Sequence, residues 1–142
     1  MVRIDLDQVL EVDVVMQVAG MAFIRGGAFQ MGTDGSDYNE KPAHRVELSP
    51  FYIDRTEVSV TAYRQFRSGY RPSTTGEGMP AGRVSWEDSR NYCRSVGKRL
   101  PTEAEWERAC KGVRSRTYSY GDLYDLKKGR TGLNLKDGPA GV

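Results

Sequence analysis

Apolar and polar residues alternate between residues 44 and 58, in the segment "HRVELSPFYIDRTEV". Successive side chains of a β-strand point to opposite faces, so a period of two predicts half-buried strands. The alternation continues across the Ser49-Pro50 break, with apolar positions at Val46, Leu48, Phe51 and Ile53. Upstream, "MAFIRGGAFQMG" (21–32) has two short apolar runs around Gly26-Gly27, which is the pattern of a β-hairpin. The polar segment 33–43 is expected to be a loop.

Three later segments carry apolar residues at helical spacing, and each follows a hydroxyl residue. Ser59, Ser85 and Thr102 can each accept a hydrogen bond from a free amide in a first helical turn. Helices are therefore expected to begin directly after them and to end at three glycines, namely Gly69, Gly97 and Gly112. The apolar side chains expected to face the core from these helices include Tyr63, Phe66, Trp86, Tyr92, Cys93, Val96 and Trp106.

The third segment, "GKRLPTEAEWERACKG" (97–112), has the strongest local signals. Thr102 and Glu105 have the spacing of a capping box, in which each side chain bonds the other residue's amide. Acidic residues also favour the first turn of a helix, where they stabilise the dipole. We therefore interpret Glu103, Glu105 and Glu107 as a cap and a solvated face, not as a group for acid–base chemistry. Trp106 is expected to be largely buried.

Length and charge narrow the class of protein. A chain of 142 residues predicts one domain, and its 21 basic and 19 acidic residues form no basic block that would favour nucleic acid. The most apolar stretch, residues 9–24, contains Glu11 and Asp13 and is too short and too charged to span a membrane. The first ten residues have acids where a signal peptide has its apolar core, so we expect a soluble chain without an export signal.

Few residues of the sequence are typical of metal or nucleophile chemistry. Cys93 and Cys110 are the only cysteines, and His44 is the only histidine. No zinc site of four cysteine and histidine ligands can be assembled from them. We interpret the cysteines as buried free thiols, because cysteine is among the most often buried residues. His44 opens a strand without neighbouring partners, which indicates a structural hydrogen bond.

Four segments, read in order, resemble the formylglycine-generating enzyme (sulfatase-modifying factor) family. They are "GGAFQMGTD", "KPAHRVELSPFYIDRTEVSVTAYRQF", "VSWEDSRNYCRSVGKRLPTEAEWERACKG" and "YSYGD". The resemblance begins near Met21, and the block 84–112 is its most specific part. It implies an α+β fold, the irregular mixed fold of this family and of C-type-lectin-like domains, here truncated. Residues 1–20 are then an N-terminal extension, and residues 21–142 are the N-terminal part of the family's domain.

The sequence departs from the family's pattern in ways that bear on chemistry. Val60 replaces an asparagine, and Ser119-Tyr120 replaces the Pro-Trp of "YPWG". The second-half segments "GNVWEW", "RGGSW" and "GFR" do not occur in this sequence. In true members, paired cysteines of that second half hold copper and oxidise a substrate cysteine with oxygen. Cys93 and Cys110 match other, structural positions, which in some members form disulfides to later cysteines. The resemblance thus implies no catalytic residue in this chain, and copper only in a full-length active member.

A calcium site is also expected from the resemblance. In "TGLNLKDG", Asn134 and Leu135 resemble a pair in the family's calcium loop, through the amide oxygen of one and the carbonyl oxygen of the other. Asp137 is the third candidate ligand, because calcium prefers several oxygens. A plain polar loop without metal is the alternative.

Two functions remain open from the sequence. The chain is either part of an oxygen-dependent oxidoreductase that acts on a cysteine of a protein or peptide substrate, or a non-catalytic binding or structural module of a bacterial protein. In the family, the core is shared with the second half. We therefore expect this chain alone to expose core surface and to associate through it. The expected core side chains are Phe51, Ile53, Tyr63, Phe66, Trp86, Tyr92 and Trp106.

Overall fold

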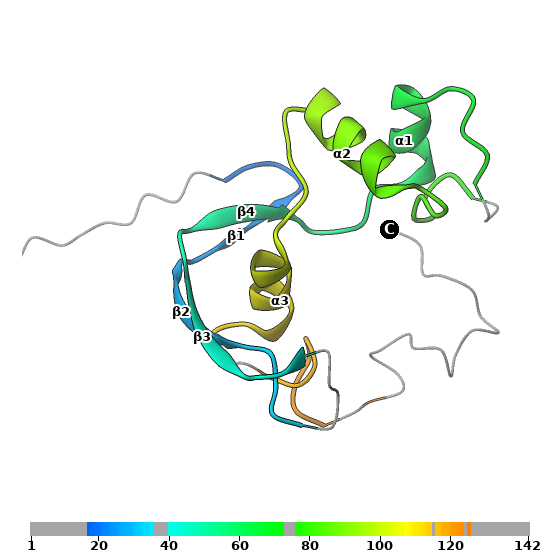
Figure 1. Ribbon diagram of the computed structural model, residues 1–142. Helices are drawn as coiled ribbons and strands as arrows, with labels where there is room; N and C mark the ends of the chain where they lie inside the picture. The colour runs from blue at the N-terminus through cyan, green and yellow to red at the C-terminus, as the bar shows by residue number, and fades with distance from the viewer. Residues whose placement is uncertain (1–16, 36–39, 73–75, 115, 124, 126–142) are drawn as a thin grey trace, which may run out of the picture.

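The computed structural model describes residues 17–35, 40–72, 76–114, 116–123 and 125. The described part is a mixed α+β fold, as predicted (Figure 1). Its elements, in chain order, are β1 (Met21–Ile24), β2 (Gly27–Met31), β3 (His44–Leu48), β4 (Phe51–Asp54), α1 (Val60–Phe66), α2 (Trp86–Ser95) and α3 (Glu103–Lys111).

The four strands form one long antiparallel ribbon. β1 pairs with β4 and β2 pairs with β3. Met21 lies opposite Asp54 and Met31 lies opposite His44, so both ladders keep the same register across the interruption between them. The expected hairpin around Gly26-Gly27 is wrong, because β1 and β2 follow each other along one side of the ribbon. The chain reverses in the segment 32–43 instead.

The interruption of the ribbon has a steric cause. Pro50 has no amide hydrogen to donate to a ladder. Across from it, a Cβ atom on Gly26 would lie 2.7 Å from the Leu48 carbonyl oxygen and 2.8 Å from Cδ of Pro50. Only glycine permits so close an approach of the two backbones. In the sequence, Gly26 suggests a turn and Pro50 suggests a break. In the structure they lie opposite each other and divide the ribbon into two short sheets.

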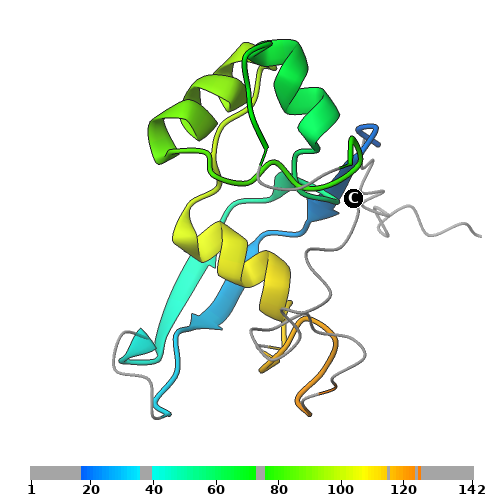
Figure 2. The same ribbon diagram turned by 90° about the vertical axis from the view of Figure 1, so that its right-hand side faces the viewer.

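The helices occupy two places relative to the ribbon. α1 and α2 lie together at one end, and α3 lies along the β2–β3 part (Figures 1 and 2). The small core between α1 and α2 consists of Val60, Tyr63 and Tyr70, which are 1%, 2% and 8% exposed. The Tyr63 ring lies 4.7 Å from that of Tyr70 and 5.5 Å from that of Tyr92, between centroids.

The three predicted helix starts are confirmed. The Ser59 and Ser85 hydroxyls accept hydrogen bonds from backbone amides three residues on, at 3.2 and 3.1 Å. Thr102 begins α3 with both bonds of the capping box, and Gly112 caps its end with a φ of 69°. α1 ends earlier than expected, with Arg67 as its cap.

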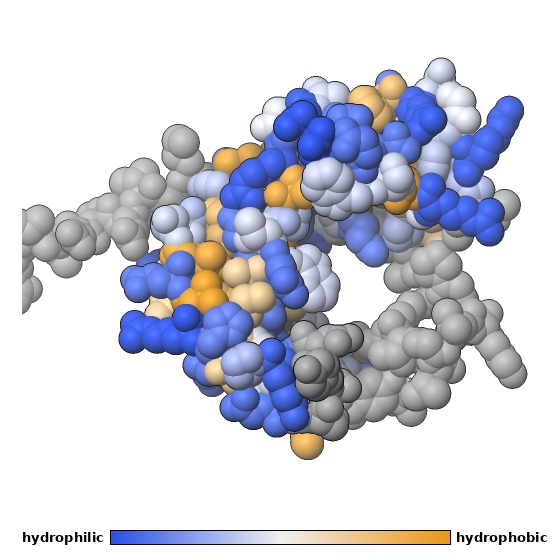
Figure 3. All heavy atoms as spheres, viewed as in Figure 1, coloured by the Kyte–Doolittle hydropathy of each residue, from blue (hydrophilic) through white to orange (hydrophobic). Residues whose placement is uncertain are grey.

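Several side chains expected in the core lie at the surface. Trp86 is 65% exposed and Trp106 is 59% exposed, so the expected burial of Trp106 is wrong. Val96 and Phe66 are also exposed, at 45% and 39%. The reason in α3 is that its inward face carries Glu105 and Arg108, which are the buried residues of that helix. Hydrophobic residues accordingly interrupt the hydrophilic surface (Figure 3). In the part of the chain that the structure describes, no helix is long and apolar enough to cross a membrane.

Candidate functional site

A cleft of about 1020 Å³ lies between β4, α2 and the first turn of α3. A concave, mainly apolar surface of this kind is the usual setting of a binding site. The segments 55–58 and 97–101 complete its walls. Its apolar and aromatic wall includes Phe51, Ile53, Val84, Tyr92, Leu100 and Trp106.

The charged side chains at the cleft are largely paired with each other. Lys98 Nζ lies 2.6 Å from Asp54 Oδ1, and this ion pair joins the segment after α2 to the end of β4. Arg99 forms a two-pronged contact with Glu105, at 2.6 and 2.5 Å. These two ion pairs are therefore made within the protein, while Arg55 and Glu57 line the cleft as further charged residues beside its apolar wall.

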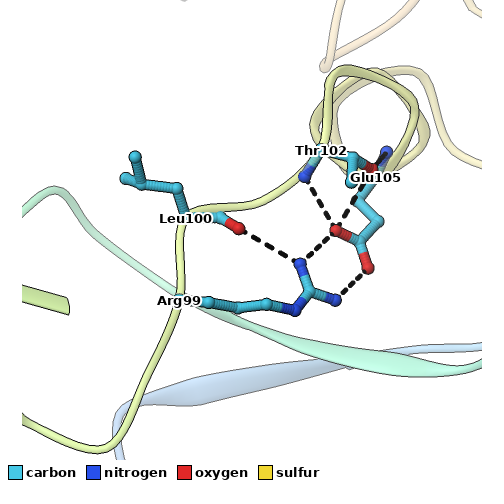
Figure 4. A network of polar contacts seen from close by, with 4 residues as sticks. All are labelled: Arg99, Leu100, Thr102 and Glu105. Atoms are coloured by element: carbon cyan, nitrogen blue, oxygen red, sulfur yellow. Dashed lines mark hydrogen bonds and ion pairs between the residues drawn. The ribbon is translucent and has the colours of Figure 1, made fainter. Parts of the chain in front are cut away.

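Arg99, Thr102 and Glu105 form the polar network that begins α3 (Figure 4). The Glu105 carboxylate also accepts a hydrogen bond from the Thr102 amide at 2.8 Å. The hydrogen bonds from Arg99, together with those from Thr102, outweigh burial and lower the pKa of Glu105 from 4.5 to about 2. A carboxylate that stays ionised through the physiological range cannot exchange protons there, so Glu105 acts as an anchor.

Glu107 differs from the predicted solvated glutamate. It accepts a hydrogen bond from the Gly32 amide at 2.7 Å, and its side chain is 15% exposed. Lys111, one helical turn on, pairs with Glu107 at 2.9 Å and donates to the Gly32 carbonyl at 3.4 Å. The two side chains together fasten α3 to the end of β2. No sequence spacing pointed to this contact, because it joins residues 75 positions apart.

Arg108 is the most buried side chain of α3. The sequence patterns did not predict that it contacts the ribbon. It is 3% exposed, and its guanidinium lies 5.5 Å from the centre of the Phe29 ring. The same group donates to backbone carbonyls where the ribbon is interrupted. These contacts are 3.3 to 3.5 Å long and end on Arg25, Gly26 and Ala28. Arg108 therefore ties α3 to the ribbon at and beside its interruption.

The two cysteines lie on separate helices. Cys93 is on α2 and lines the cleft, and Cys110 is on α3. Both are free thiols and partly buried, so the prediction of free thiols is confirmed and that of full burial is not. Burial raises the pKa of both, and the nearby carboxylates Asp54 and Glu107 add to the effect. Both thiols are therefore protonated at neutral pH, which disfavours the thiolate that metal binding and nucleophilic attack require.

His44 has the structural role expected of it. Its Nδ1 lies 2.9 Å from the Pro42 carbonyl oxygen, and it donates there because a carbonyl can only accept. Within the described residues, no three of the side chains of His, Cys, Asp and Glu group closely enough to hold a metal ion. The predicted calcium ligands Asn134, Leu135 and Asp137 lie outside the described residues, so that site stays a prediction.

Comparisons with known proteins cover most of the chain. The family model described as "Sulfatase-modifying factor enzyme 1-like domain" matches residues 7–137. The formylglycine-generating enzyme of Streptomyces coelicolor is 32% identical over 159 residues, which covers 72% of this chain and 51% of that enzyme. The inactive C-alpha-formylglycine-generating enzyme 2 of Bos taurus is 30% identical over 163 residues, which covers 76% of this chain and 54% of the relative.

A solved structure agrees on the fold. PvdO from Pseudomonas aeruginosa superposes with a TM-score of 0.59 at 24% identity, over 78% of this chain and 52% of PvdO. The chain thus spans about half the length of these relatives. Alignments of 159 and 163 residues exceed the 142 residues of the chain, so the relatives carry insertions relative to it. The chain belongs to the family of sulfatase-modifying factor enzyme 1-like domains, as its resemblance to formylglycine-generating enzymes predicted.

Proposed function

We propose that this chain is a scaffold part of a domain of the formylglycine-generating type and that its own cysteines do not carry out copper-dependent oxidation. The observation that carries the proposal is the placement of Cys93 and Cys110 on two different helices, each with a raised pKa. The chemistry implied by the resemblance needs a pair of cysteines that hold copper together. Copper(I) favours thiolate ligands, and burial of both thiols works against that form.

The family includes relatives that are named as formylglycine-generating enzymes and relatives that are named as inactive. The Streptomyces coelicolor protein is named a formylglycine-generating enzyme, whereas the bovine relative is named as inactive. A shared fold does not bring a shared activity, which has to be argued from the site. In this chain the candidate site is a cleft with paired rim charges and an aromatic wall, and such a surface is suited to binding. The resemblance to formylglycine-generating enzymes supports a protein or peptide as its substrate or ligand class.

The proposal is tested by incubating the full chain with a CxPxR-type peptide, oxygen and copper, and by searching for the aldehyde product by mass spectrometry. We expect no aldehyde above a blank without protein. The Streptomyces coelicolor enzyme is the positive control for peptide, copper and detection. Aldehyde formation by this chain that is lost in a Cys93→Ser, Cys110→Ser double variant would refute the proposal.

The second candidate function is a non-catalytic binding or structural module, as in a lectin-like domain. The same cleft favours it, because its apolar and aromatic wall is suited to binding a ligand. The two candidates differ in whether a completed domain forms aldehyde. A completed domain that binds peptides and never oxidises them supports the binding module.

A further inference from the structure

We propose that a hollow of about 570 Å³ beside the start of β1 is a binding site for a small aromatic carboxylate. We call this hollow the β1 pocket. The ring pair of Phe23 and Tyr52 is its aromatic floor, and Arg55 is the group that holds the carboxylate. The β1 pocket is a second place on the chain besides the cleft, so its function does not depend on the scaffold role.

A turn and the strand pairing fix the backbone around the β1 pocket. The Met21 amide donates to the Val18 carbonyl at 3.1 Å, and Gly20 has a φ of 75°, a conformation that glycine adopts readily. The Arg55 amide donates to the Gly20 carbonyl at 3.0 Å, which continues the pairing of β1 with β4 by one residue. The segment 17–20 is thereby held as one wall of the pocket, next to the end of β4.

The aromatic floor follows from the register of the strands. Phe23 lies directly opposite Tyr52 in the antiparallel ladder, and opposite residues point to the same face. The two ring centroids lie 5.2 Å apart, and the ring planes are inclined by 55°. Both side chains are partly buried. A third aromatic ring can pack on such a pair in the same tilted or offset way, which is the favourable geometry for aromatic groups.

Arg55 gives the β1 pocket a positive charge that is free to meet a ligand. The side chain is exposed, and within the described residues its guanidinium takes part in no ion pair or hydrogen bond. None of the described residues that line the pocket is acidic. The neighbouring carboxylate of Asp54 does not line the pocket and pairs with Lys98 at 2.6 Å. The planar fork of a guanidinium matches the two oxygens of a carboxylate.

The size and charge of the β1 pocket select the class of ligand. Its volume lies within the range of roughly 300–1,000 Å³ that is usual for small-molecule sites. Several donors usually hold a phosphate group together, whereas this pocket offers a single cation, Arg55. A cationic ligand would be repelled by Arg55, and an aliphatic acid would leave the ring faces unused. A carboxylate carried on one aromatic ring uses both Arg55 and the aromatic floor.

The test is a titration of the full 142-residue chain with phenylacetate, followed by ligand-observed nuclear magnetic resonance. We expect saturable binding. Phenylacetamide has the ring without the charge, and acetate has the charge without the ring. Each should bind at least tenfold more weakly. Because Arg55 is exposed, raising the salt concentration from about 20 mM to about 500 mM should weaken phenylacetate binding at least threefold and leave phenylacetamide unchanged.

Matched variants locate the site. Arg55→Gln keeps the backbone bond to Gly20 and should weaken phenylacetate binding at least fivefold, whereas Arg71→Gln, at an exposed position outside the pocket, should change it less than twofold. Phe23 lines the β1 pocket and not the cleft, and Trp106 lines the cleft and not the pocket. Phe23→Leu should therefore weaken binding at least fivefold and Trp106→Leu less than twofold. Circular dichroism of the four variants checks that the fold persists.

A measurement on the unsubstituted chain supports the assignment independently of these variants. Phenylacetate ring protons should give intermolecular nuclear Overhauser effects to the ring of Phe23. Their absence at saturation would overturn the proposal, and so would the absence of saturable binding. Equal affinities for phenylacetate and phenylacetamide would refute the role of Arg55.

Other occupants of the β1 pocket or other sites for the probe give distinct outcomes. Met21, Tyr52 and Arg55 line both the pocket and the cleft. A larger loss in Trp106→Leu than in Phe23→Leu would therefore assign the carboxylate to the cleft and refute the proposal. Residues 1–16 contain four acidic residues. A tenfold gain in phenylacetate affinity on their deletion would assign the pocket to that segment and would also refute it.

Discussion

Replacement of Glu105 by glutamine removes the charge from the carboxylate on which the start of α3 depends. The side chain accepts from Arg99 through both of its oxygens and from the Thr102 amide. Glutamine has the same size and keeps one oxygen acceptor, so the substitution isolates the charge and the two-pronged contact. Hydrogen bonds to ionised groups contribute more than neutral ones, which makes this carboxylate the most sensitive point of the network.

The magnitude follows from the pKa and the exposure of the partner. A pKa of about 2 against the ordinary 4.5 corresponds to about 3 kcal/mol if the partners were fully shielded from water. The Arg99 side chain is 65% exposed, however, so water screens the pair substantially. We therefore expect Glu105→Gln to lower the free energy of unfolding by about 1–2 kcal/mol at pH 7.

The pH dependence gives the sharper test. The folded-state pKa of Glu105 is depressed, so its contribution is fully present above about pH 4.5 and is lost as the pH falls towards 2. The stabilities of the wild-type chain and of Glu105→Gln should therefore converge below pH 4.5. Urea unfolding followed by far-ultraviolet circular dichroism measures both, in an osmolyte that raises overall stability without replacing the contact.

The matched control is Glu103→Gln, which makes the same chemical change at an exposed position in the same helical turn. It should cost less than about 0.5 kcal/mol, as surface substitutions usually do. Equal losses in the two variants would refute the anchoring role of Glu105. A difference between wild type and Glu105→Gln that stays constant from pH 7 to pH 2.5 would refute the assigned pKa and its cause.

Three further substitutions or additions have defined outcomes. Thr102→Ala should lower the free energy of unfolding by about 1 kcal/mol, through loss of the cap that bonds the Glu105 amide at 3.2 Å, and an unchanged urea midpoint would contradict it. Arg108→Met should cost about 1–3 kcal/mol because it removes the hydrogen bonds from a buried guanidinium to three ribbon carbonyls, whereas Arg114→Met at an exposed position should be near neutral in the same unfolding assay. Calcium should raise the melting temperature where magnesium does not, and Asn134→Ala or Asp137→Ala should remove that shift in differential scanning fluorimetry; no shift in the wild-type chain would favour the plain polar loop.

The helix starts could be predicted from the sequence because their causes are local. Ser59, Ser85 and Thr102 cap amides that are three residues away, so the residues that make each contact lie within one turn. The strands could also be located from the alternation of residues. Their pairing could not, because Gly26 and Pro50 suggest turns when each is read alone. The close approach of the two backbones appears only when both strands are placed side by side.

The exposure of the tryptophans shows a second limit of helical spacing. Periodicity identifies the apolar face of a helix, and it does not specify which neighbouring element covers that face. In α3, Arg108 and Glu107 contact the ribbon through hydrogen bonds to its backbone. Trp106 lies on another face of the helix and lines the cleft. A buried arginine that contacts a ribbon 80 or more residues away has no signature in a local pattern. The cleft could therefore not be predicted from the sequence, although several of the side chains that line it were expected to make apolar contacts in the core.

The central claim is that this chain is a scaffold part of a domain and leaves apolar surface uncovered when it stands alone. Burying one large apolar side chain contributes about 1.5–3 kcal/mol, against a net domain stability of about 5–15 kcal/mol. Four large apolar side chains are exposed here, namely Trp86, Trp106, Val96 and Phe66. The free energy that their burial would contribute is comparable with much of the net stability of a domain. The most direct measurement is scanning calorimetry of the isolated full chain, with binding of a hydrophobic dye recorded in parallel. We expect a broad transition of low cooperativity, strong dye binding and self-association, and a sharp cooperative transition when the part of the Streptomyces coelicolor enzyme outside its match to this chain is supplied. One sharp transition of a monomer that binds no dye would contradict the claim.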